Sequence, residues 1–299
     1  MNALQTLLTE SGYLVADGAM GTMLFAAGLG HGGSPELWNV EQPDKVAAVH
    51  REYLEAGSRI LLTNTFGGNR FRLQLHNMEE RVTEFNRAAA AILRAEVDAS
   101  GKRAIVAGDI GPSGGLIQPL GELTSEQLAD AFAEQAAALI EGGVDVIWIE
   151  TMSALEEMQA AVAGVRRSSA GIPIITTMTF DTHGRTMMGI TPERAIRELS
   201  SYGAAAVGGN CGNGPEEIIG VVEKMRQTVP EAVLVAKANA GVPVLEKGRP
   251  VYRATPEDMA VYALQAYAAG AQIIGACCGS TPAHIRSIAA ALASSVPAD

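Results

Sequence analysis

The sequence predicts an α/β protein with a single domain over residues 1–299, folded as a (β/α)8 or TIM barrel. First, eight short apolar runs lack polar alternation, which is typical of parallel strands buried on both faces. Second, a segment with helical spacing or helical end signals follows every run. Third, no linker or change of composition divides the chain. A doubly wound sheet, the alternative, more often uses fewer strands at this length.

The expected strands are short and almost entirely apolar, as a barrel wall between an inner core and an outer helical layer requires. They cover residues 13–16, 59–63, 104–107, 144–149, 173–178, 204–207, 233–236 and 273–276.

Helices are expected between the strands and after the last one. They cover residues 44–56, 79–97, 125–141, 154–167, 192–201, 215–228, 256–269 and 282–292. Three of them open with Thr-Pro, at Thr191, Thr255 and Thr281, where threonine caps the helix and proline takes the first helical position. Glycines follow several of the expected ends, as helix C-termini prefer.

The formal charge argues against two classes of partner. The chain has 22 basic and 33 acidic residues, a net charge of −11, which disfavours nucleic acid and anionic membrane surfaces. The first residues lack the basic and apolar regions of a signal peptide, and no stretch approaches the length of a membrane span. We therefore expect a soluble, cytoplasmic protein. A homo-oligomer is the default for such proteins, although the sequence does not show it.

All three cysteines of the chain lie at glycine-lined ends of expected strands: Cys211, Cys277 and Cys278. Neighbouring residues of a strand point to opposite faces, so the adjacent pair can reach one metal only if the backbone bends there, which Gly279 permits. Three thiolates suit zinc and leave a fourth tetrahedral position open. Burial as small hydrophobic side chains is the alternative for any single cysteine. A vicinal disulfide is disfavoured because it is strained and leaves one thiol over.

In a barrel of this kind the active site lies at the C-terminal ends of the strands. Polar residues stand at the ends of the expected strands, and they are Asp17, Thr63, Asn64, Thr65, Asp109, Glu150, Asp181, Asn210, Lys237 and Asn239. Cys211 and Cys277, 66 positions apart, should therefore meet at the barrel mouth.

Four motifs, in this order, carry a resemblance to a known family. They are Asp17-Gly18-Ala19-Met20-Gly21-Thr22, Thr63-Asn64-Thr65-Phe66, Gly209-Asn210-Cys211 and Gly275-Ala276-Cys277-Cys278-Gly279. With them, nearly the whole chain resembles the zinc-dependent homocysteine S-methyltransferases. That family includes the homocysteine module of cobalamin-dependent methionine synthase, the betaine–homocysteine methyltransferases and the enzymes that use S-methylmethionine.

The resemblance implies an enzyme that transfers a methyl group to zinc-activated homocysteine and forms methionine. Cys211, Cys277 and Cys278 would be the ligands of Zn²⁺. Because homocysteine is a thiol that is mostly protonated at neutral pH, binding to zinc would turn it into a reactive thiolate.

The resemblance also assigns residues to the amino acid end of homocysteine. Glu150 would bind the ammonium group, and Asp17 would be the second acid that holds this end of the substrate. The turn that starts at Gly18 would bring backbone N–H groups near the substrate carboxylate. Asn239 would either bind the substrate or lend its oxygen to zinc, unless it is an ordinary turn asparagine. For each acid, a solvated carboxylate at a strand end is the alternative.

The methyl donor stays open at this point. Phe66 matches one aromatic residue of a betaine site, but Gly67 and Thr151 stand where further aromatic residues of a cation–π cage are expected. Thr63 to Phe66 and the Glu150-Thr151 pair look more like the methionine synthase module, whose methyl-corrinoid is held on another domain. In that case a separate corrinoid-binding protein must deliver the methyl group, which derives from methylfolate.

Three other functions are compatible with the same residues. A related methyltransferase would act on another thiol or a selenol with a sulfonium donor such as S-methylmethionine. A non-catalytic barrel would bind zinc alone. A redox protein would use Cys277 and Cys278 as a dithiol without zinc.

Overall fold

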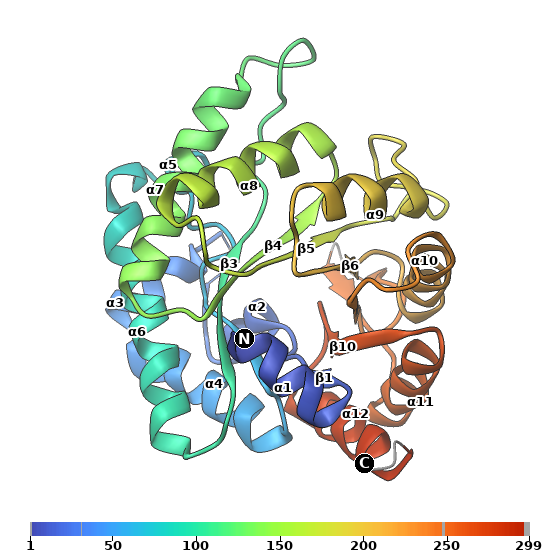
Figure 1. Ribbon diagram of the computed structural model, residues 1–299. Coiled ribbons are helices and arrows are strands. Elements are labelled where there is room, and N and C mark those ends of the chain that lie inside the picture. Colours follow the sequence, from blue (N-terminus) through green and yellow to red (C-terminus); the bar gives the residue numbers. More distant parts are fainter. Residues whose placement is uncertain (1, 31, 247–248, 296–299) are drawn as a thin grey trace.

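Eight parallel strands form a nearly closed barrel inside a layer of helices (Figure 1). The strands are β1 (Leu14–Val15), β2 (Ile60–Leu62), β3 (Ile105–Ile110), β4 (Val146–Met152), β5 (Ile174–Met178), β6 (Ala206–Cys211), β7 (Leu234–Ala238) and β10 (Ala271–Ala276). Their order in the sheet is β1-β10-β7-β6-β5-β4-β3-β2, and a parallel bridge between Ala16 and Ile60 joins the two ends of that order. The computed structural model describes residues 2–30, 32–246 and 249–295. The predicted TIM barrel is confirmed.

All eight predicted strands are present, and four of them are longer at their C-terminal ends than the apolar runs indicated. β3, β4, β6 and β7 continue through Asp109, Glu150, Asn210 and Lys237. The sequence suggested that these polar residues follow the strands, whereas they belong to them. Their side chains are therefore held by strand geometry rather than by loops.

All eight predicted helices are also present. They are α4 (Pro43–Ala56), α6 (Val82–Ser100), α7 (Ser125–Glu141), α8 (Leu155–Ser168), α9 (Pro192–Ser201), α10 (Pro215–Thr228), α11 (Pro256–Ala268) and α12 (Pro282–Ser295). Thr191 and Thr255 cap α9 and α11, since each side chain accepts a hydrogen bond from a backbone N–H of the first turn. Gly57 ends α4 with φ +110°, a conformation that favours glycine.

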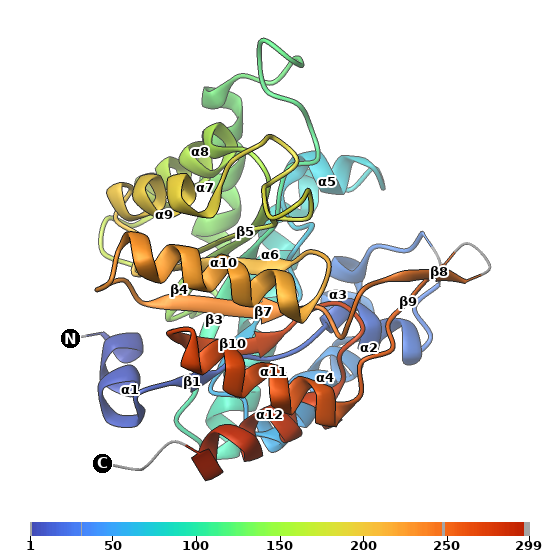
Figure 2. The ribbon, with the colours of Figure 1, turned by 90° about the vertical axis from the view of Figure 1, so that its right-hand side faces the viewer.

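Several short elements were not predicted. They are α1 (Ala3–Ser11), α2 (Met20–Ala26), α3 (Trp38–Glu41), α5 (Arg70–Gln74), the 3₁₀ turn η1 (Pro35–Leu37), and the hairpin strands β8 (Val244–Glu246) and β9 (Arg249–Val251). Most contain too few residues for a periodic pattern to stand out. The 3₁₀ turn η2 (Glu79–Arg81) occupies the start of the helix predicted over residues 79–97. Figure 2 shows α1 at one end of the barrel and the β8–β9 hairpin at the other.

Alternation along the strands decides which side chains enter the barrel. In β4, Val146 and Trp148 belong to the inner apolar cluster, whereas Ile147 and Ile149 pack against the helices. The next inward position of β4 is Glu150. The strands β3 and β7 show the same pattern, so Asp109 and Lys237 also follow inward apolar residues.

Within the part of the chain that the structure describes, no helix has the length and apolar character needed to cross a membrane.

Candidate functional site

The three cysteines meet at the C-terminal ends of β6 and β10. Cys211 is the last residue of β6, and Cys277 and Cys278 directly follow β10. All three are free thiols whose Sγ atoms lie within 4.8 Å of one another, with 3.9 Å between Cys211 and Cys278. A tetrahedral metal with metal–sulfur bonds of about 2.3 Å keeps its sulfur ligands about 3.8 Å apart. The donor set and its spacing therefore fit one soft metal ion.

Backbone turns bring the thiols together. Cys211 has φ +63°, and Gly279 has φ +79° directly after the vicinal pair. The Ser280 N–H donates a hydrogen bond of 3.2 Å to the Cys277 carbonyl, which closes a tight turn over the pair. The bend that the sequence required at this place is confirmed.

The β8–β9 hairpin adds a side chain that the sequence did not indicate. Tyr252 follows β9, and its phenol lies beside the Cys278 thiol, so that each group affects the pKa of the other. A Cβ atom at Gly279 would overlap the Tyr252 side chain, so the glycine allows the close approach. Hydrogen bonds from Cys211 and Cys277, with a smaller contribution from Tyr252, lower the pKa of Cys278.

A buried ionic cluster lies inside the mouth, formed by Lys237 of β7, Asp17 after β1 and Glu150 of β4. The Lys237 Nζ atom is 3.1 Å from Asp17 Oδ1 and 4.0 Å from Glu150 Oε2. The second Asp17 oxygen accepts a hydrogen bond of 2.8 Å from the Leu62 N–H, which fixes the carboxylate against β2. Lys237 was noted in the sequence only as a polar strand end, because its partners come from other strands.

Asp109 lies in the same mouth, and threonines of the Thr63–Thr65 motif hold its backbone. Its N–H donates to Thr63 Oγ1 at 2.9 Å, and its carbonyl accepts from Thr65 Oγ1 at 2.7 Å. These bonds tie the end of β3 to the segment after β2. The two threonines of the Thr63–Thr65 motif therefore have a structural role, which the resemblance to the family did not indicate.

The buried charged groups of the cluster change one another's pKa values. Burial raises the pKa of Glu150 to about 7, although Lys237 opposes the change. Burial, followed by the charge of Glu150, raises the pKa of Asp109 well above its usual range. Burial lowers the pKa of Lys237, but the surrounding acids, first Asp17 and then Glu150, outweigh it and leave the pKa above its ordinary value. Lys237 is therefore a permanent cation in this pocket.

Apart from Asp17 Oδ1, which pairs with Lys237, three buried oxygen atoms of the mouth have no hydrogen-bond donor among the described residues: Asp109 Oδ1, Glu150 Oε2 and Asn239 Oδ1. The side chain of Asn239 is oriented by a hydrogen bond of 2.7 Å, which its amide nitrogen donates to the carbonyl of Gly212, next to Cys211. Buried acceptors without donors are costly, so they indicate a ligand that supplies N–H groups or a positive charge.

The remaining predicted residues, Gly18 and Phe66, lie in the segments that follow β1 and β2. A Cβ atom at Gly18 would lie 2.6 Å from Ser280 Oγ and 2.8 Å from the Tyr53 hydroxyl, so only glycine fits there. The Ala19 N–H already donates to Ser280 Oγ at 3.0 Å, and it is not free for a substrate carboxylate. Phe66 packs against Gly111, whose N–H donates 3.1 Å to the Phe66 carbonyl.

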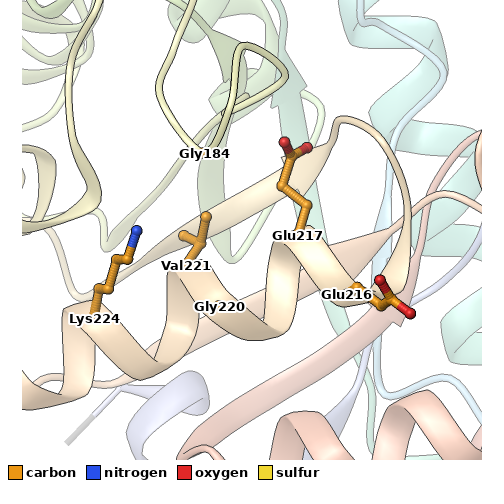
Figure 3. A pocket seen from close by; sticks show the side chains of 6 residues that line it. All are labelled: Gly184, Glu216, Glu217, Gly220, Val221 and Lys224. Atoms are coloured by element: carbon orange, nitrogen blue, oxygen red, sulfur yellow. The ribbon is translucent and has the colours of Figure 1, made fainter.

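A separate hollow of about 350 Å³ lies along α10, below the loop that contains Gly184 (Figure 3). Glu216, Glu217 and Lys224 of α10 line it, and none of the cysteines or of the buried carboxylates does. The chemistry described above is therefore not in this hollow.

Replacing Lys237 by Met should lower the free energy of unfolding by about 3 kcal/mol or more, because Asp17 and Glu150 lose their buried counter-charge. Urea unfolding at neutral pH measures the change. Lys224→Met, at an exposed position of α10, is the matched control and should change the free energy of unfolding little. Equal losses in the two variants would contradict the role of Lys237.

Solved structures with this fold include homocysteine methyltransferase MmuM from Escherichia coli. Its oxidised form superposes with a TM-score of 0.83 and 23% identity, over 97% of this chain and 99% of that one. Its metallated form gives a TM-score of 0.82 with the same identity and the same coverage. This likeness supports the barrel fold.

Sequence comparison identifies the family. The methionine synthases of Mycobacterium tuberculosis and Mycobacterium leprae are 35% and 33% identical to this chain in alignments of 297 positions that cover 94% of the chain. The chain spans only about a quarter of their length, 24% in both cases. The model of the family described as homocysteine S-methyltransferase matches residues 14–292. The chain therefore belongs to the homocysteine S-methyltransferase family.

Proposed function

We propose that this chain is a zinc-dependent S-methyltransferase that methylates the homocysteine thiolate and forms methionine, with residues 1–299 as one homocysteine-binding domain. Its family supports homocysteine as the acceptor. The observation that carries the proposal is the convergence of three free thiols beside a buried carboxylate pocket with unpaired oxygens. This pairing suits an amino acid that bears both a thiol and an ammonium group.

Cys211, Cys277 and Cys278 would hold the zinc ion. Three sulfur ligands at this spacing leave one position for a further ligand. When bound, zinc supplies the positive charge that lets a substrate thiol lose its proton near neutral pH. A metallated form of MmuM supports a metal in this fold.

Glu150 and Asp17 would bind the ammonium end of homocysteine. Glu150 Oε2 has no hydrogen-bond donor and is 4.0 Å from Lys237, so it is free to pair with an entering N–H group. Lys237 would hold Asp17 in place and prevent repulsion between the two acids. Asn239 Oδ1 would accept from the substrate or bind zinc before the substrate arrives.

The pocket would orient the sulfur for an in-line attack on the donor. As the bond between sulfur and the methyl carbon forms, the bond between the methyl group and the donor breaks, and its electrons leave with the donor. The proton of the thiol is lost before this step. Phe66 and Gly18 would also contact the substrate.

A methyl-corrinoid held by another domain or protein is the donor that we propose. The two methionine synthases are about four times as long as this chain, which supports a donor supplied from outside the barrel. An aromatic cage for betaine lacks support, because Gly67 and Thr151 carry no ring and Trp148 is buried in the barrel core.

Glu150→Gln should weaken homocysteine binding by roughly ten- to a hundredfold, the effect of losing a charge-assisted hydrogen bond. The same variant should bind 3-mercaptopropionate, a thiol without an amino group, as well as the unaltered protein does. Titration calorimetry of zinc-loaded protein measures both affinities. Glu156→Gln, on the exposed face of α8, is the control. Equal losses for both thiols would contradict an ammonium-binding role of Glu150.

Methionine should form from homocysteine with methylcobalamin as the donor, and not with glycine betaine. Zinc-loaded protein is compared with Cys278→Ala as the blank, and methionine is measured directly. Turnover with betaine above the blank would overturn the proposed donor. Absence of methionine with methylcobalamin, betaine and S-methylmethionine alike would contradict the catalytic function.

A further inference from the structure

Two residues at the mouth have a backbone conformation that residues other than glycine rarely adopt. Among the described residues, positive φ without glycine occurs at Asn77, Thr151, His183 and Cys211. Thr151 (φ +63°) directly follows Glu150, and Cys211 (φ +63°) directly follows Asn210. Such a conformation is strained, and it is least favourable for a β-branched residue such as threonine. Thr151 therefore needs support from its surroundings.

The side chain of Asn210 supplies that support. Its Oδ1 atom accepts a hydrogen bond of 2.9 Å from the Thr151 N–H, and its Nδ2 atom donates one of 2.7 Å to Thr151 Oγ1. Asn210 is fully buried, so water does not compete for these bonds. Its amide thus fixes both the backbone and the side chain of Thr151.

These bonds cross the end of a third strand. β5 lies between β4, which contains Thr151, and β6, which contains Asn210. Thr179, directly after β5, donates through Oγ1 to the Asn210 carbonyl at 3.1 Å, and its N–H donates to the Met152 carbonyl at 3.0 Å. The ends of β4, β5 and β6 are consequently one hydrogen-bonded unit.

We propose that Asn210 is a positioning residue that sets the separation between the Glu150 carboxylate and the Cys211 thiol. Glu150 is joined to Thr151 and Asn210 to Cys211 by one peptide bond each, and the two amide hydrogen bonds connect Thr151 with Asn210. A fixed separation would favour thiols that carry an ammonium group at a fitting distance from the sulfur, as homocysteine does. This inference rests on the proposed function, in which the two groups bind opposite ends of one substrate.

The loop of Cys211 has further supports that do not involve the Asn210 side chain. Asn239 Nδ2 donates to the Gly212 carbonyl at 2.7 Å. Glu217 Oε2 accepts from the Asn213 N–H at 2.8 Å. Loss of the Asn210 amide should therefore release Thr151 and Glu150 more than it disturbs the thiol cluster, so the two ends of the substrate should respond differently.

The test compares Asn210→Ala with the unaltered protein in three measurements on zinc-loaded protein. Calorimetry gives the affinities for homocysteine and for 3-mercaptopropionate, and competition with a chromophoric chelator gives the zinc affinity. Homocysteine affinity should fall about tenfold, the equivalent of the lost support for one strained residue. The affinities for 3-mercaptopropionate and zinc should stay within about twofold.

A rescue variant separates positioning from general damage. Thr151→Gly in the Asn210→Ala background should restore most of the homocysteine affinity, because glycine adopts positive φ without support. Thr151→Ala in the same background keeps a Cβ atom and should not restore it. Asn210→Asp, which keeps the acceptor for the Thr151 N–H, should show a smaller loss and serves if Asn210→Ala fails to fold.

The outcomes are distinct. Equal losses for both thiols and zinc, or the absence of rescue by Thr151→Gly, would overturn the inference and leave the proposed function intact. The inference would also be overturned if Asn210→Ala preferred homocysteine to 3-mercaptopropionate as strongly as the unaltered protein does. If the unaltered protein itself binds homocysteine no better than 3-mercaptopropionate, the proposed function fails and this inference fails with it.

Discussion

Alternation of side chains along the parallel strands is the constraint on which the site depends. In β4, every second side chain points into the barrel. Val146 and Trp148 fill the core, and Glu150 is the next inward residue. The same period takes β7 from Val235 to Lys237 and β10 from Ile273 through Gly275 to Cys277. Because all strands run in the same direction, the polar ends of these series meet in one place. A shift of one residue in any strand would move its polar end into the helix layer.

The mouth that results has two chemically different ends. At one end, three thiols are grouped at a spacing that suits a soft metal. At the other, carboxylates surround a buried lysine and leave acceptor oxygens unpaired. Burying these charged groups opposes folding because they lose their hydration. Charged groups that are buried in spite of this cost are typical of a ligand-binding site. Family membership and this division of chemistry both support a thiol amino acid as the substrate.

Much of the fold was predictable because its signals repeat. Each buried strand is an apolar run, and each long helix carries its own start or stop residues, as at Thr191 and Thr255. The short elements were missed because a helix such as α5, with five residues, or an exposed three-residue strand such as β8 lacks a periodic apolar face. The order of strands then sufficed to place Cys211 near Cys277.

The finer part of the site was not predictable, because it depends on contacts between distant segments. The ion pair of Lys237 with Asp17 joins β7 to the end of β1. The position of Tyr252 beside Cys278 depends on the hairpin, and the conformation of Thr151 depends on an amide from β6. None of these leaves a local pattern in the sequence.

X-ray absorption at the zinc edge, with and without homocysteine, tests the account most directly. The account predicts three sulfur ligands at about 2.3 Å and one lighter ligand in the free protein, and four sulfur ligands after homocysteine is added. An unchanged number of sulfur ligands after saturation with homocysteine would contradict it, since the substrate thiol would then not reach the metal.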